Sequence, residues 1–107
     1  ERHGAGCTPG YWKNHLDAWA ATGFAPGDGF DATFGTSYFG PSLTLGQAVG
    51  LGGAGLKKLA RHGTAALLSA AHPGVDYPFS VAQVIALVQA NNVEPLVAAN
   101  ELGCPLN

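Results

Sequence analysis

Residues 7–19 read CTPGYWKNHLDAW and bring a cysteine, both tryptophans, a tyrosine and a histidine close together in the chain. Thr8 is a good helix N-cap, and Pro9 suits the first helical position, where a missing N–H is tolerated. The stretch predicts a helix from about Pro9 to Ala21, which Gly23 ends in a left-handed conformation. Spacing at i, i+3, i+4 and i+7 predicts that one helical face anchors the core with Trp12, His15, Leu16 and Trp19.

Further along the chain, two capping boxes mark helix starts. Gln47 follows Thr44, and Gln83 follows Ser80, at the spacing where the two residues of each pair cap one another. With the apolar periodicity, these signals predict helices over residues 9–21, 44–51, 56–71, 80–91 and 96–102. No segment alternates as a strand does. The sequence therefore predicts an all-α fold, a compact bundle of about five short helices.

The connection over residues 24–43 is rich in glycine and aromatic side chains. So many aromatics predict that this long loop packs against the core, with room for a short helical turn near Asp31. Disorder is the alternative, although disordered segments are usually poor in aromatics. The side chains concerned are Phe24, Phe30, Phe34, Tyr38 and Phe39.

Composition limits the classes of protein to consider. We expect residues 1–107 to form one helical domain, with residues 1–6 as a flexible lead-in. Only 11% of the residues are charged and the formal net charge is −2, so weak repulsion between copies favours association. Nucleic-acid binding needs a clustered basic footprint, which this charge balance argues against. No apolar run approaches the ~20 residues of a membrane span.

Three strings carry a resemblance that covers nearly the whole chain. They are CTPGYWKNH at residues 7–15, LARHGTAALLSAAHPGVDYPFSVAQVI at residues 59–85 and NELGCPL at residues 100–106. They resemble a domain family of secreted bacterial proteins marked by the same motifs. The resemblance implies one exported bacterial domain, outside the cell or at its surface. It assigns no catalytic residue and no cofactor.

The only two cysteines, Cys7 and Cys104, stand before the first predicted helix and after the last. This placement, with the export that the resemblance implies, favours a disulfide that joins the termini. Such a bridge would close a loop of about a hundred residues and stabilise the fold by up to about 4–5 kcal/mol. Two free buried thiols in a cytosolic protein are the alternative. The spacing and the ligand count exclude a C-x-x-C redox pair and a zinc set.

Residues that carry chemistry are scattered along the chain. The carboxylates lie in loops or at helix ends without a paired arrangement, and no serine has a nucleophile-elbow context. We therefore predict no enzyme and no catalytic residue. The histidines show no metal-ligand spacing, so we predict no bound metal. They are His3, His15, His62 and His72.

A short basic patch stands near the start of the helix at residues 56–71. It would suit an acidic sugar or an anionic partner, and a solvated helix face is the simpler interpretation. Its members are Lys57, Lys58, Arg61 and His62.

Two classes of function remain. In the first, the domain is a non-catalytic structural or interaction module that associates with itself, as an oligomer or an extracellular filament, or docks to other cell-envelope proteins. In the second, it is an extracellular carbohydrate- or metal-binding module. Buried aromatics with Ala and Val faces outside favour assembly, whereas aromatics along an open groove favour a glycan. The residues expected at a ligand site or an interface are Tyr11, Trp12, His15, Trp19, Tyr38, Tyr77 and Ala86, the last on the apolar helix at residues 80–91.

Overall fold

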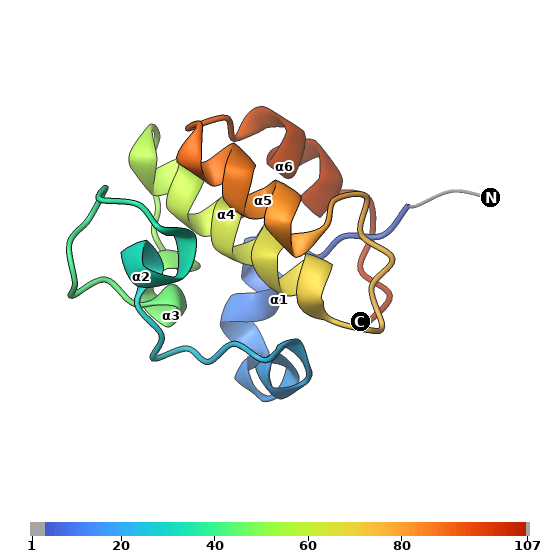
Figure 1. Cartoon of the computed structure of the whole chain (residues 1–107). Helices are drawn as coiled ribbons and strands as arrows, with labels where there is room; N and C mark the ends of the chain where they lie inside the picture. Colours follow the sequence, from blue (N-terminus) through green and yellow to red (C-terminus); the bar gives the residue numbers. More distant parts are fainter. Residues whose placement is uncertain (1–3, 107) are drawn as a thin grey trace.

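A computed structural model describes residues 4–106, and this part of the chain is helical without a β-strand (Figure 1). The predicted all-α fold is confirmed. Seven helical segments replace the predicted five, because the first helix splits and the turn near Asp31 is a helix of its own. They are α1 (Pro9–Asn14), the 3-10 helix η1 (Leu16–Thr22), α2 (Phe30–Phe34), α3 (Leu45–Ala48), α4 (Leu56–Ala71), α5 (Val81–Gln89) and α6 (Glu94–Asn100).

Helix α4 is the centre of the fold. Figure 1 shows α5 and α6 packed along it and α1 and α3 below it, and all four helices contact α4. The helix has the predicted bounds, and its stretch from His62 to Ser69 is buried without a break. A helix buried all round is the core of its fold rather than a surface element. The charges of α4 are accordingly confined to its first two turns.

Gly63 lets α5 approach α4 closely. A Cβ at this position would lie 2.9 Å from Cγ2 of Val88, a separation that real Cβ atoms do not show. Glycine in a helix interior costs about 1 kcal/mol relative to alanine, and here it makes room for the Val88 side chain.

The predicted helix at residues 9–21 is wrong as a continuous element. It breaks at His15, whose backbone angles are φ −134° and ψ 62°, and resumes as the 3-10 helix η1. In a continuous α-helix the carbonyls of Tyr11 and Trp12 would accept hydrogen bonds from backbone N–H groups four residues later. Here side chains contact these carbonyls: His15 Nδ1 is 2.9 Å from the Tyr11 oxygen, and Trp19 Nε1 donates to the Trp12 oxygen. After the break, Trp12 and Trp19 still face the core, but Leu16 is 54% exposed.

The connection at residues 24–43 packs down as predicted. Phe30 and Phe34 of α2 are fully buried, with ring centroids 4.5 Å apart. Asp31 folds the following loop, because its carboxylate accepts hydrogen bonds from the Thr36 hydroxyl and from the backbone N–H groups of residues 38–40. Burial raises the pKa of Asp31, but these hydrogen bonds outweigh it and hold the pKa below its ordinary value.

Both capping boxes are confirmed. The Thr44 hydroxyl accepts from the Gln47 N–H while the Gln47 side chain accepts from the Thr44 N–H, and Ser80 and Gln83 repeat the arrangement at the start of α5. Helix α5 ends at Gln89, slightly before the predicted end, and Asn91 follows in a left-handed conformation.

The two ends of the described chain meet. The Gly6 N–H donates to the Gly103 carbonyl, and the Ala5 N–H donates to the Asp76 carbonyl. A Cβ at Gly6 would collide with the carbonyl of Ala99, so only glycine fits here. Of the lead-in predicted for residues 1–6, residues 5 and 6 make these backbone hydrogen bonds, and residues 1–3 lie outside the described part.

Candidate functional site

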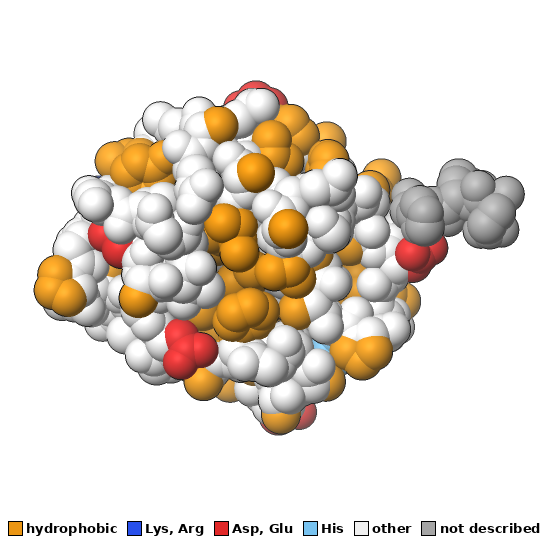
Figure 2. Space-filling view, viewed as in Figure 1, with side chains coloured by type: hydrophobic (Ala, Val, Ile, Leu, Met, Phe, Trp, Pro, Cys, Tyr) orange, Lys and Arg blue, Asp and Glu red, His pale blue; other side chains and the backbone are white. Residues whose placement is uncertain are grey.

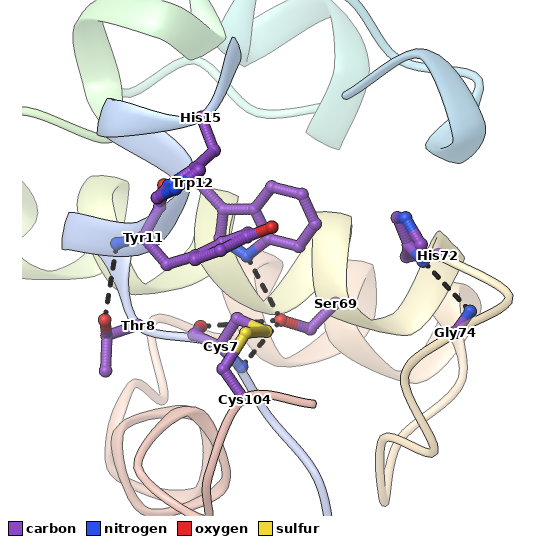
Figure 3. Close-up of a disulfide and its surroundings, with 9 residues drawn as sticks. All are labelled: Cys7, Thr8, Tyr11, Trp12, His15, Ser69, His72, Gly74 and Cys104. Carbon is purple, nitrogen blue, oxygen red and sulfur yellow. Dashed lines mark hydrogen bonds between the residues drawn. A yellow bond between two sulfur atoms is a disulfide. The ribbon is translucent and has the colours of Figure 1, made fainter. Parts of the chain in front are cut away.

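The predicted disulfide is present. Cys7 and Cys104, 97 residues apart in sequence, are bonded with 4.5 Å between their Cα atoms (Figure 3). Ser69 of α4 organises the surroundings, since its hydroxyl accepts from the Cys7 N–H and from Trp12 Nε1 and donates to the Cys7 carbonyl. This hydroxyl therefore ties the N-terminal segment to the central helix. Sequence reasoning missed that role; the signal was a serine within a buried apolar stretch.

Trp12 and Trp19, proposed from the sequence both as core anchors and as ligand residues, are core residues. Their exposed fractions are 0% and 1%. The indole N–H of Trp12 is used by Ser69, and that of Trp19 by the Trp12 carbonyl at 3.0 Å. With neither surface nor a free donor, these two side chains are unable to contact a ligand.

The three tyrosines predicted at a ligand site or an interface differ in their burial and in their contacts. Tyr77 is buried and its hydroxyl donates to Oδ1 of Asn100 at 2.7 Å. Tyr38 is half-buried and donates to the carbonyls of Val88 and Gln89, which ties the aromatic loop to the end of α5. Tyr11 stacks on exposed His15 with 4.2 Å between ring centroids. The structure therefore does not join the predicted aromatics into one open groove.

A buried polar chain links Tyr77, Asn100 and His62. The Asn100 amide nitrogen lies 3.0 Å from the carbonyl oxygen of His62 and 3.2 Å from its Nδ1, while Asn100 Oδ1 accepts from Tyr77. Burial raises the pKa of Tyr77, so its hydroxyl stays protonated. Burial, with the nearby charge of Arg61, lowers the pKa of His62. These three residues come from separate segments, and no sequence pattern predicts that they meet.

We expect this lowered pKa to make folding sensitive to mild acid. The folded-state pKa lies below the ordinary value of 6.5, so the unfolded chain binds the proton first as the pH falls. The stability contributed by neutral His62 is fully present above pH 6.5 and is lost as the pH falls below it. Urea unfolding between about pH 7 and pH 5 should show a decline of at most about 1.4 kcal/mol per pH unit from this group.

The matched variant for this measurement is His62→Gln, which keeps a polar side chain but does not titrate. We expect it to be less stable than the parent at neutral pH and to show a flatter profile over the same range. Parallel slopes for parent and variant would show that His62 is not the source of the decline.

The residues of the predicted basic patch lie in three different environments. Lys58 pairs with Glu94, with 3.2 Å between Nζ and Oε2. Lys57 lines an open hollow beside Phe39 and Leu43. Arg61 and His62 line a separate cavity together with Lys13 of α1.

The outer surface of α5 carries no charge. Residues 77–93 contain no Asp, Glu, Lys, Arg or His. Only Val84 and Val88 of α5 are buried, and Ala82, Ala86 and Ala90, spaced by four residues, form an exposed ridge. Figure 2 shows hydrophobic side chains gathered on this face, with some Asp and Glu and no Lys or Arg of the described residues. Ala86, which the sequence predicts at a ligand site or an interface, is exposed on this surface.

An apolar hollow of about 230 Å³ adjoins the α5 surface, between the start of α5 and α6. Leu102, which is 49% exposed, forms part of it. The remaining lining residues are Pro78, Phe79, Pro95, Ala98 and Ala99.

Metal ligands do not gather in residues 4–106, where no three His, Cys, Asp or Glu side chains are placed to hold an ion. His3 lies outside this range. None of the helices described is long and apolar enough to cross a membrane.

Comparison of the sequence with protein-family models and with curated proteins, and of the fold with solved structures, gives no match. The resemblance to a domain of secreted bacterial proteins therefore stays a prediction.

Proposed function

We propose that this chain is a non-catalytic interaction module that binds a second copy of itself through the outer surface of α5. The observation that carries the proposal is a solvent-facing helix without charge. A surface helix normally places charged or polar residues on the side away from the core. On α5 that side carries no charge: it presents the alanine ridge of Ala82, Ala86 and, at the C-cap, Ala90, together with the uncharged side chains of Gln83 and Gln89.

Charge argues for a second copy as the occupant. A charged partner would bury its own charges against a surface that has none to pair with them, which is costly. The α5 surface of another copy has no such charges, and a net charge of −2 opposes the approach only weakly. Small side chains along an i, i+4 ridge also let two helices pack closely.

The adjoining apolar hollow at Leu102 would extend the contact. A specific interface needs about 800 Å² from each partner, and the molecule exposes 5110 Å² in all. Contact between two identical α5 surfaces gives a closed dimer, whereas α5 against a different surface of the next copy gives a filament. The disulfide supports an oxidising, extracellular setting for either assembly.

We expect Ala86→Glu to weaken the assembly about tenfold or more, because a carboxylate at the centre of an uncharged contact would be buried without a partner. Sedimentation velocity at high micromolar concentration in physiological salt measures this directly. Ala20→Glu is the matched control, because Ala20 is an exposed alanine of η1, outside the α5 surface.

A parent protein that sediments as a monomer under these conditions would overturn self-association and leave docking to another envelope protein as the better proposal. Equal loss of assembly in Ala86→Glu and Ala20→Glu would also count against α5, since general repulsion would then explain both. Circular dichroism of each variant verifies that the fold is retained.

A further inference from the structure

A cavity of about 340 Å³, open to solvent, lies away from the α5 surface, where the start of α1, the loop after α3, the middle of α4 and the end of α6 meet. Its volume is at the lower end of the range for small-molecule sites, about 300–1,000 Å³. The polar lining consists of Thr8, Lys13, Arg61, His62 and Glu101, which come from three separate helical regions of the chain.

Hydrogen-bond chemistry fixes the orientation of His62. Its carbonyl oxygen only accepts, so the Asn100 atom 3.0 Å away must be the amide nitrogen. The same nitrogen lies 3.2 Å from His62 Nδ1, which must therefore be the accepting nitrogen of the neutral ring. The Tyr77 hydroxyl donates to the other Asn100 atom, Oδ1, and agrees with this assignment. The ring proton of His62 is then on Nε2.

Nε2 of His62 is the atom that is free to face a ligand. Within residues 4–106 it has no hydrogen-bond partner, and His62 is only 8% exposed. The one fully buried side-chain polar atom without a partner in that range is Thr64 Oγ1, so Nε2 keeps an opening. His62 lines the cavity, and its Nε2–H is a donor without a partner among the described residues.

Two cations line the same cavity. The stem of Lys13 passes over Gly50, where a Cβ would lie 3.7 Å from the lysine Cδ, and its ammonium has no partner in the described chain. Nη1 of Arg61 donates to the carbonyls of Leu51 and Gly53, which leaves its other two nitrogens without a partner among the described residues. The lining of the cavity therefore contains several hydrogen-bond donors and a single carboxylate, that of Glu101.

Glu101 narrows the choice of anion. The two cations outnumber this carboxylate, so the cavity attracts anions in general, and Glu101 favours an anion that also carries hydroxyl groups and a ring. Glu101 can accept hydrogen bonds from ligand hydroxyls, and Pro9, Val49 and Leu51 provide apolar surface for a sugar ring.

We propose that this cavity binds a small hydroxylated carboxylate, of the sugar-acid class, with the ligand carboxylate held by Lys13, Arg61 and Nε2–H of His62. This binding does not depend on the proposed self-association. The α5 face shows no Lys or Arg among the described residues, so the cations of the cavity lie on another side of the molecule (Figure 2).

Titration of the full chain with D-galacturonate, followed by NMR, tests the proposal. We expect saturable shifts of the His62 ring signals and of the Gly10 and Gly50 amides, which border the cavity. D-galactose, the neutral sugar with the same ring, should leave these signals unchanged, and inorganic phosphate should bind more weakly than galacturonate.

Lys13→Ala tests the residues without threatening the fold, because Lys13 is exposed. We expect it to weaken galacturonate binding at least about fivefold through the loss of a charge-assisted hydrogen bond. Lys57→Ala is the matched control, since it removes the same charge from the neighbouring hollow, and its affinity should stay within about twofold of the parent.

Four results would overturn the proposal. They are an absence of saturation at tens of millimolar galacturonate, equal shifts with galactose, tighter binding of phosphate, and equal weakening in Lys13→Ala and Lys57→Ala.

Discussion

Trp19→Ala is expected to destabilise the fold by about 3–5 kcal/mol, the range for replacing a buried large aromatic side chain by alanine. Trp19 is 1% exposed and lies in η1, which packs against α4. The substitution removes the indole from the core, leaves a cavity beside the central helix, and deletes the hydrogen bond to the Trp12 carbonyl. Chemical unfolding measures the loss, with Trp12 as the remaining fluorescent reporter.

The same 3-10 helix provides the control. Leu16 is 54% exposed, so Leu16→Ala should change stability by only about 0.5 kcal/mol. A Trp19→Ala variant that unfolds at the same denaturant concentration as Leu16→Ala would show that the indole is not part of the core.

Removal of the Cys7–Cys104 disulfide should have an effect of similar size. In the chain-entropy model, a link between residues 97 positions apart stabilises the fold by about 4–5 kcal/mol, because it restricts the unfolded chain. The double variant Cys7→Ala/Cys104→Ala leaves no thiol behind, and its unfolding midpoint should fall accordingly. Alkylation of unreduced, denatured parent protein, followed by mass measurement, should find no free thiol.

The stability of the reduced parent protein distinguishes the contribution of the covalent link from that of packing around the sulfur atoms. If the link matters, reduction and the double variant should destabilise the fold by similar amounts. A double variant within about 1 kcal/mol of the oxidised parent would contradict the expected stabilisation. Destabilisation of the variant without a matching effect of reduction would assign the loss to packing around fully buried Cys7.

Local signals in the sequence determined most helix starts and the class of the fold. The two capping boxes work through residues three positions apart, so nothing distant in the chain is needed to read them. The bounds of α4 were predictable for the same reason, since a glycine-rich segment precedes the helix and His72-Pro73-Gly74 follows it. The disulfide was predictable from the placement of the only two cysteines, before the first helix and after the last, together with the export that the resemblance implies.

The first helix shows what local signals miss. Its apolar spacing fits a continuous helix, but the side chains of His15 and Trp19 lie on the carbonyls that would have continued it. Two sets of hydrogen bonds compete for these carbonyls: those of the side chains and those of a continuous helical backbone. The outcome depends on the burial of both tryptophans against α4, which is a tertiary effect. The predicted common face of Trp12, His15, Leu16 and Trp19 therefore separated into two buried and two exposed residues.

The sequence by itself thus determined an all-helical chain closed by one disulfide and poor in charge. Tertiary structure alone decided which polar residues meet, because Lys13, Arg61, His62 and Glu101 are distant in sequence and share a cavity only after α1 and α6 pack on α4. It also decided that α5, apolar nearly all round, lies at the surface. Hydrophobic periodicity reports how apolar a helix is, whereas burial depends on how many neighbours the rest of the chain supplies.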